Sequence, residues 1–130
     1  MPEPGANRSA VNHDSSPAAP PIAYADFAKV DIRAGTIRSA APLARARTPA
    51  FVLEIDFGPE LGVKHSSAQI TVHYAPETLV GRQIAAVVNF APKRIAGVSS
   101  EVLVLGFPDA AGAVVLVEPT IGVSDGARLY

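Results

Sequence analysis

The run AFVLEIDF, residues 50–57, decides the fold class of this chain. Large apolar side chains stand at every odd position, and mostly polar ones lie between them. Successive side chains of a β-strand point to opposite faces of a sheet, so this period of two predicts a half-buried strand. Gly58-Pro59 ends it. The side chains expected to face the core are Phe51, Leu53, Ile55 and Phe57.

A strand with a sharp bend is predicted just upstream, over Lys29–Ala41. Val30, Ile32 and Ala34 alternate with polar residues, but the next apolar residue is Ile37, one position out of phase. Gly35 lies at this change of phase. A glycine in such a place indicates a β-bulge, which bends a strand as small closed barrels require.

Further short apolar runs follow, bounded by glycine or proline. The segment from Thr71 to Gly81 has room for one short helix or a turn. Two of the runs are apolar on both faces, which indicates more apolar surface than one small barrel hides and favours a partner such as a second copy of the chain. The predicted strands are Val63–Ile70, Gln83–Asn89, Glu101–Phe107, Ala113–Val117 and an edge strand Ala127–Tyr130.

These runs predict an all-β fold, a five-stranded OB-fold barrel with short helical and extra strand additions that form a dimer interface. Residues 23–130 make up this domain. Residues 1–22 are rich in proline, poor in apolar side chains and without periodicity, which is typical of a disordered N-terminal tail.

The composition favours a cytoplasmic protein. The tail lacks the apolar core of a secretory signal, and no run reaches the roughly 20 apolar residues of a transmembrane helix, so no membrane insertion is expected. The chain has no cysteine, which excludes disulfides and thiolate metal sites.

No group of residues predicts catalysis, a metal or a cofactor. Ser66 follows His65, but neighbours on a strand point to opposite faces, so the pair does not make a serine nucleophile with its base. His65 and His73 lack a suitably spaced third metal ligand. Glu54 and Asp56 share an outward strand face, where solvated carboxylates are the simpler interpretation. We therefore expect a protein that is not an enzyme.

Positive charge is gathered in two segments, although the net charge is −1. Residues 31–47 hold four arginines and a single acid, and residues 82–98 hold three cations and no acid. Such a distribution suits nucleic acid better than the net charge suggests, although chance clustering in a short chain remains an alternative.

A proline-stiffened turn within residues 86–101 carries the clearest binding signal. It follows a buried strand that ends in Asn89, and it presents Lys93 beside Arg94, as a phosphate site on a rigid barrel rim would; an ordinary basic loop is the alternative. Aromatic residues make up only 6% of the chain, and Phe51 and Phe57 are assigned to the core. Few therefore remain to stack bases, which favours structured RNA recognised by shape over single strands.

Three segments resemble the CsaA family, which belongs to the wider tRNA-binding domain family that includes domains appended to tRNA synthetases. They are DIRAGTI (31–37), KHSSAQIT (64–71) and NFAPKRIAGVSSEVLVLG (89–106), within a resemblance that spans about residues 24–130. The resemblance implies an OB barrel, a homodimer and tRNA binding along the basic surface of the dimer.

The resemblance also implies RNA-binding residues, with Glu101 orienting Arg94 or accepting a hydrogen bond from a base edge. The loop PLARARTPA (42–50) departs from the wider family, in which a His-Pro and a lysine stand there. The RNA-binding residues that the resemblance implies are Asn89, Lys93, Arg94, Ser100 and Glu101 in the turn and Lys64, Ser66 and Ser67 in the third strand. Positive charge alone adds Arg38 and Arg45 to this set.

Members of the CsaA family are also described as export-related chaperones that bind unfolded precursor proteins and the SecA motor. This second function would need an exposed apolar surface, which the surplus of apolar strand residues can supply. The same residues would equally serve a dimer interface, and the sequence alone does not separate the two.

Overall fold

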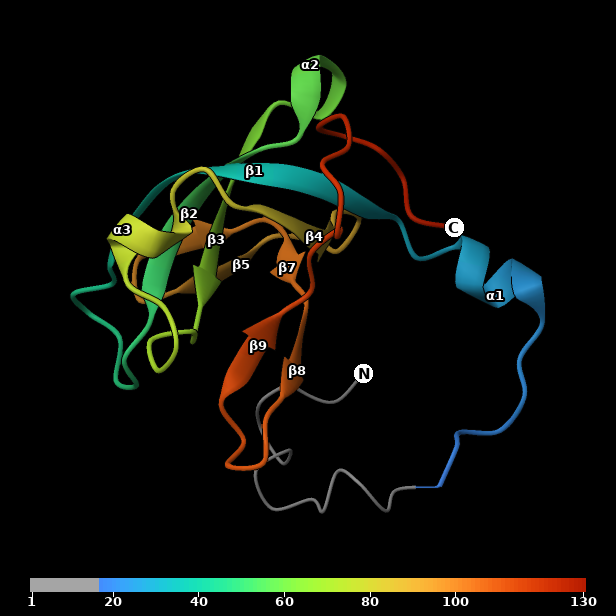
Figure 1. Cartoon of the computed structure of the whole chain (residues 1–130), viewed down its shortest axis with the longest axis horizontal. Coiled ribbons are helices and arrows are strands. Elements are labelled where there is room, and N and C mark those ends of the chain that lie inside the picture. The colour runs from blue at the N-terminus through green and yellow to red at the C-terminus, as the bar shows by residue number, and fades with distance from the viewer. Residues whose placement is uncertain (1–16) are drawn as a thin grey trace.

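The computed structural model describes residues 17–130, and its centre is a five-stranded antiparallel sheet curled into a nearly closed barrel (Figure 1). The strands follow the order β3-β2-β1-β4-β7 across the sheet. This arrangement confirms the predicted all-β, OB-like class. The strands are β1 (Ile32–Pro42), β2 (Phe51–Asp56), β3 (Val63–Ala68), β4 (Gln83–Val87) and β7 (Leu103–Val104).

Smaller elements surround the barrel. Two hairpins extend from it, β5 (Lys93–Ile95) with β6 (Val98–Ser100), and β8 (Gly106–Pro108) with β9 (Val114–Leu116). The short helix expected between residues 71 and 81 is present as α3 (Pro76–Leu79), whereas α1 (Tyr24–Ala28) and α2 (Gly58–Leu61) were not predicted. None of the helices in residues 17–130 has the length and apolar character needed to cross a membrane.

The predicted tail over residues 1–22 falls mostly on positions 1–16, which lie outside the described residues. Residues 17–22 are exposed and form neither helix nor strand. The disordered tail therefore stays a prediction.

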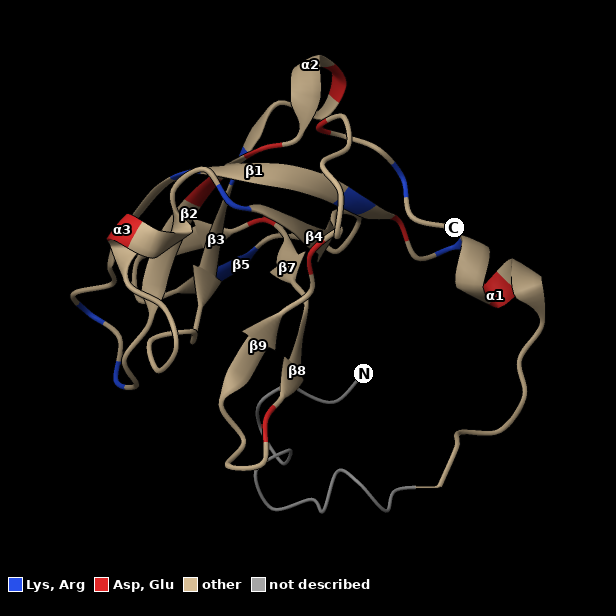
Figure 2. Cartoon of the chain, viewed as in Figure 1, with Lys and Arg blue, Asp and Glu red and all other residues tan. Residues whose placement is uncertain are grey.

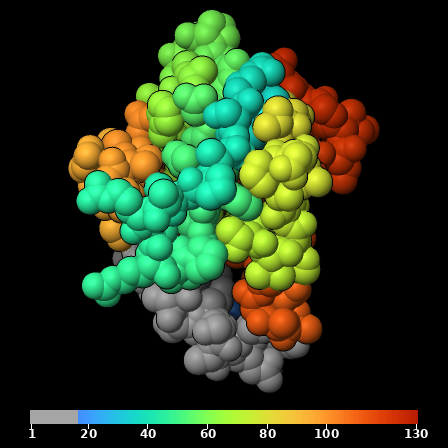
Figure 3. Space-filling view, turned by 90° about the vertical axis from the view of Figure 1, so that its left-hand side faces the viewer, coloured from blue at the N-terminus to red at the C-terminus, as the bar shows by residue number. Residues whose placement is uncertain are grey.

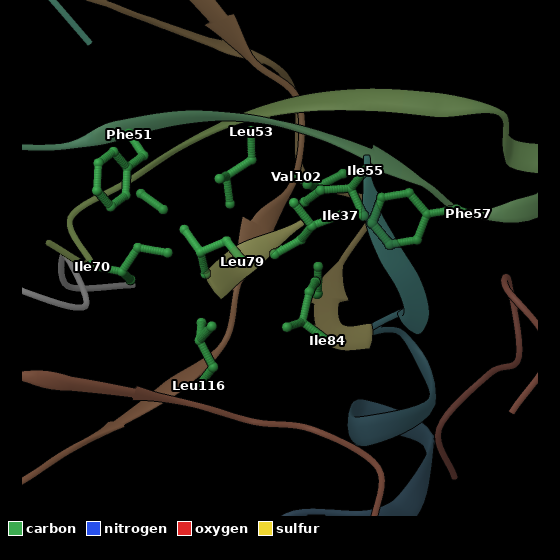
Figure 4. Close-up of a cluster of buried hydrophobic side chains, with 12 residues drawn as sticks. Ile37, Phe51, Leu53, Ile55, Phe57, Ile70, Leu79, Ile84, Val102 and Leu116 are labelled. Carbon is green, nitrogen blue, oxygen red and sulfur yellow. The ribbon is translucent and has the colours of Figure 1, made fainter. Parts of the chain in front are cut away.

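Strand β2 supplies the centre of the core, as its alternation predicted (Figure 4). Leu53 and Ile55 are fully buried, and Phe51 and Phe57 are nearly so. Leu79 of α3 and Ile84 of β4 complete the cluster from other sides. Burial of these large side chains on one face of a bent sheet closes the barrel around them.

The bulge in β1 lies at Arg38 and not at the predicted Gly35. Pairing between β1 and β2 is irregular between Ile37 and Ser39, whereas Gly35 pairs regularly with Ile84. Gly35 has a different role, because a Cβ atom there would lie 2.7 Å from side-chain atoms of both Ile55 and Phe57. The glycine thus lets two core side chains pack directly on the backbone of β1.

The C-terminal segment completes the sheet beside β1. The Ala34 N–H donates to Ala127 O at 2.9 Å, and the Leu129 N–H donates to Ile32 O at 2.8 Å. The expected edge strand 127–130 is thus reduced to a single bridge, between Arg33 and Arg128, flanked by these bonds. The segment still occupies an edge of β1 that would otherwise be open.

The two runs that were predicted to be apolar on both faces differ in the structure they form. In β4, residues 84–87 are all buried, as predicted for a central strand. The run 101–107 is not one strand, because the chain leaves the barrel after β7 to pair β8 with β9. Phe107 is 67% exposed and Val115, its cross-strand neighbour, is 41% exposed. An apolar surface therefore stays open on the β8–β9 hairpin.

Candidate nucleic-acid interface

The basic turn of the sequence forms the β5–β6 hairpin. Its two-residue loop is Ala96-Gly97, and both residues have positive φ angles, 50° and 85°. This combination is the one a type I′ hairpin turn requires. Lys93 and Arg94 lie exposed on β5, and Arg94 Nη2 donates to Gly97 O at 3.1 Å across the turn. The hairpin thus holds two adjacent cations on a short, rigid strand.

Ser100 and Glu101 fasten this hairpin to the barrel. Ser100 Oγ accepts the Ser67 N–H at 3.0 Å. Glu101 bonds twice to His65, because its Oε1 accepts the His65 N–H and its own N–H donates to His65 O, both at 2.8 Å. The carboxylate of Glu101 therefore orients β3 and β6 relative to each other, and it contacts His65 rather than Arg94.

A small acidic cluster surrounds the His65 ring. Nε2 lies 3.1 Å from Glu54 Oε2, and Nδ1 lies 3.5 Å from Glu101 Oε1. The hydrogen bond from the Ser39 hydroxyl, and then the one with His65, hold the pKa of Glu54 below its ordinary value. Within residues 17–130, no three histidine, aspartate or glutamate side chains are grouped to hold a metal ion. This hydrogen-bonded cluster links β2, β3 and the end of β6.

The loop between β1 and β2 brings a second basic segment to the hairpin. We call residues 43–49 the arginine loop, after Arg45 and Arg47, which are both exposed. A Cβ atom placed on Gly97 would lie 3.0 Å from Arg45 Nη1, so the Arg45 guanidinium rests against the hairpin turn. Blue segments mark this loop and β5 in Figure 2, and the two lie side by side in the space-filling view of Figure 3.

The structure brings together only some of the predicted site residues. Arg45, Lys93, Arg94, Ser67 and Ser100 belong to the arginine loop, the hairpin and the strand that the hairpin contacts.

Two predicted residues of β3 face the other way. Ser66 has 0% exposed surface, and its hydroxyl donates to Ser67 O at 3.1 Å and to Val102 O at 3.2 Å. Direct contact of Ser66 with RNA is incompatible with this burial, because alternation along the strand points its side chain into the barrel. Lys64, two residues before it, lies on the same face of β3.

Arg38 and Asn89 have structural partners. Arg38 Nη2 lies 3.2 Å from Asp56 Oδ2 and 3.7 Å from Asp125 Oδ2. The Gly58 N–H, and then Arg38, hold the pKa of Asp56 below its ordinary value, so the Asp56 carboxylate that Arg38 faces is ionised at neutral pH. Asn89 Oδ1 accepts the Asp31 N–H at 3.0 Å, and its Nδ2 donates to Lys29 O at 2.7 Å. The Asn89 amide thus ties the start of β1 to the end of β4.

Residues that the sequence analysis did not single out also lie on or near this face. Arg47 and Gln69 are exposed beside the hairpin, and Phe90, which precedes it, is 45% exposed. Phe90 lies outside any run of alternating apolar residues, and this feature of the sequence could have indicated that its side chain is not part of the core.

Comparison with known proteins gives a consistent picture. Residues 32–128 match the profile of a family described as "Putative tRNA binding domain". Chaperone CsaA of Bacillus anthracis str. Ames is 52% identical with a TM-score of 0.79, and CsaA of Picrophilus torridus is 45% identical with the same TM-score. Each covers 85% of this chain and is covered completely by it.

The similarity extends to a tRNA synthetase. Methionine--tRNA ligase of Porphyromonas gingivalis is 36% identical over 124 residues, which cover 95% of this chain. The chain spans only 18% of the length of that ligase.

Proposed function

The chain belongs to the tRNA-binding domain family and, within it, to the CsaA proteins, and from this membership we propose that its arginine loop and β5–β6 hairpin form the surface that contacts tRNA. The observation that carries the proposal is the contact of Arg45 with the turn at Gly97. It joins two basic segments that are far apart in the sequence into one face. The chain is thus a binding module, and it matches a binding domain rather than a catalytic one.

The chemistry of this face suits a phosphate backbone. Arg45, Arg47, Lys93 and Arg94 place four cations on two adjacent segments, and the hairpin is held by its tight turn and by its bonds to β3. Loops at this end of an OB barrel are common sites for oligonucleotides. We assign Ser100, Glu101 and Asn89 a positioning role, because their side chains accept hydrogen bonds from backbone N–H groups.

A salt titration with purified total tRNA tests the proposal. We expect affinity to fall steeply as salt rises, because each neutralised phosphate releases counterions. Single-stranded DNA and an unfolded polypeptide serve as competitors. We expect tRNA binding that weakens steeply as salt rises and that neither competitor displaces. Weak, salt-insensitive binding of tRNA would contradict the proposal.

The exposed pair Phe107 and Val115 favours a second property, association of two copies through the β8–β9 hairpins. Both side chains are apolar and lie opposite each other on the two strands. Light scattering should give a dimer mass for the chain and a smaller mass for Phe107→Ser. If the chain is monomeric, the same surface becomes available to unfolded precursor proteins, and the chaperone function with SecA as partner becomes the better hypothesis.

We place the protein in the cytoplasm, because its proposed ligand, tRNA, is used there. Fractionation of cells that express the chain with an epitope tag would test this location.

A further inference from the structure

A hollow of about 390 Å³ separates the arginine loop from the β5–β6 hairpin. Its walls combine Arg45 and Arg47 with Ser67 and Gln69, and small apolar residues of the loop and the hairpin, among them Ala46, complete the lining. This volume lies within the range of pockets that hold small organic molecules. No carboxylate lines it, whereas the larger hollow beside α2 is lined by Asp56 and Asp125 and would repel an anion.

We propose that this hollow receives one unstacked nucleobase of the bound RNA, an inference that rests on the proposed function and adds a subsite to it. A base needs a flat surface for its ring and polar groups for its edge. An arginine guanidinium supplies such a flat surface in many RNA complexes. The amide of Gln69 both donates and accepts hydrogen bonds, as the edge of a base requires.

The polar groups of the hollow are available for such a ligand. Within residues 17–130, the side chains of Arg45, Arg47 and Gln69 make no hydrogen bond or ion pair with one another or with other residues. Gln69 is exposed at the end of β3, where the strand has already left its pairing with β2. Its amide therefore gains hydrogen bonds on binding without losing any within this part of the protein.

The charge of the walls selects a nucleotide over an apolar peptide side chain. A base enters attached to a phosphate, and that phosphate would lie at the rim of the hollow, where Arg45 and Arg47 are placed. An apolar peptide side chain would fill the small apolar part but leave both guanidinium groups without an anion. A base inside a duplex remains stacked between its neighbours and cannot enter, so the hollow selects unpaired positions.

Two RNA hairpins with the same stem provide the probe. In one, a single 2-aminopurine is bulged, and in the other it is paired with uridine. We expect the full chain to bind the bulged RNA about tenfold more tightly, since an arginine over the face of the base and a hydrogen bond to its edge each contribute about 1 kcal/mol. The fluorescence of the bulged 2-aminopurine should also change on binding, while that of the paired one should not.

Three variants locate the base. Ala46→Leu narrows the hollow, and Gln69→Ala removes the group that reads the base edge. Both should reduce the tenfold preference for the bulge, which is the ratio of the two affinities measured with the same variant and therefore does not depend on its overall affinity for RNA. Ala44→Leu is the matched control, because Ala44 lies exposed on the same loop but does not line the hollow. This variant should keep the preference.

The outcomes separate this inference from the proposed function. If wild type binds tRNA but binds both hairpins equally, the nucleobase subsite is refuted and the tRNA surface stands. If tRNA itself does not bind, both fail. If Ala46→Leu loses capture of a carboxymethylated, unfolded protein and retains the bulge preference, the hollow is a peptide site and the inference is overturned.

Discussion

Removal of the two hairpin cations, by Lys93→Ala together with Arg94→Ala, should weaken tRNA binding in a salt-dependent way. Each phosphate contact contributes about 0.7–0.9 to the slope of log affinity against log salt, so two lost contacts make the slope shallower by about 1.4–1.8. Across a fourfold rise in salt, from about 50 to about 200 mM, wild type should therefore lose roughly tenfold more affinity than the variant. Both side chains are exposed on β5, so the fold should persist.

Filter binding or fluorescence anisotropy with total tRNA at four or five salt concentrations gives the slope directly. Arg38→Ala is the matched control for charge, because Arg38 is equally basic and exposed but faces Asp56 and Asp125. We expect its slope to equal that of wild type within about 0.3 units, since Arg38 belongs to neither the arginine loop nor the hairpin and should neutralise no phosphate. A slope for the hairpin variant that matches wild type, or a larger change in Arg38→Ala, would refute the assignment of this face.

Three further predictions address the scaffold. Gly35→Ala should lower the free energy of unfolding in urea by about 1–3 kcal/mol, because the new Cβ atom would lie 2.7 Å from two core side chains. Gly122→Ala is the control, because a Cβ atom there meets nothing within 4 Å, and it should change the free energy of unfolding by less than about 0.5 kcal/mol. Equal changes in the two variants would contradict the packing role of Gly35. Ala96→Asn should raise the urea midpoint by an amount equivalent to about 0.5–1 kcal/mol, because asparagine tolerates the positive φ of 50° better than alanine does, and a lower midpoint would contradict the turn assignment. The hydrogen bond from His73, and then that from the Ala113 N–H, hold the pKa of Asp109 below its ordinary 3.8, so its stabilising effect is present above that pH and is lost as pH falls through the folded value. Asp109→Asn should therefore be less stable than wild type at pH 6, and the difference should begin to shrink as pH falls below 3.8; a difference that does not shrink would assign the effect to shape alone.

Local alternation was enough to predict the parts of the fold that depend on one strand. The period of two in β2 identified its buried side chains, since burial there follows directly from strand geometry. The bulge was placed at Gly35 rather than Arg38, because a glycine that accommodates Phe57 from another strand looks the same in sequence as a glycine that bends its own. The broken run at 101–107 depended on β9, a partner that no local pattern identifies.

In the candidate site too, features that depend on local sequence were predictable, and features that depend on contacts between distant segments were not. Lys93 and Arg94 were recognisable as exposed cations next to a turn, and they are exposed on β5. The burial of Ser66 and the bonds of Asn89 to residues 29 and 31 arise from contacts between distant segments, which the sequence does not display. The contact between Arg45 and the turn at Gly97 is also of this kind, and it defines the face.

The bonds between β1 and residues 126–129 also set limits on how fast this protein reaches its native state. They join the first strand of the barrel to a segment near the opposite end of the chain, so they form only after a very long loop has closed. Chains dominated by such distant pairings fold in milliseconds to seconds rather than in microseconds. In stopped-flow refolding, we expect a slow main phase in this range, with protection of the Ala34 amide from hydrogen exchange gained at its end.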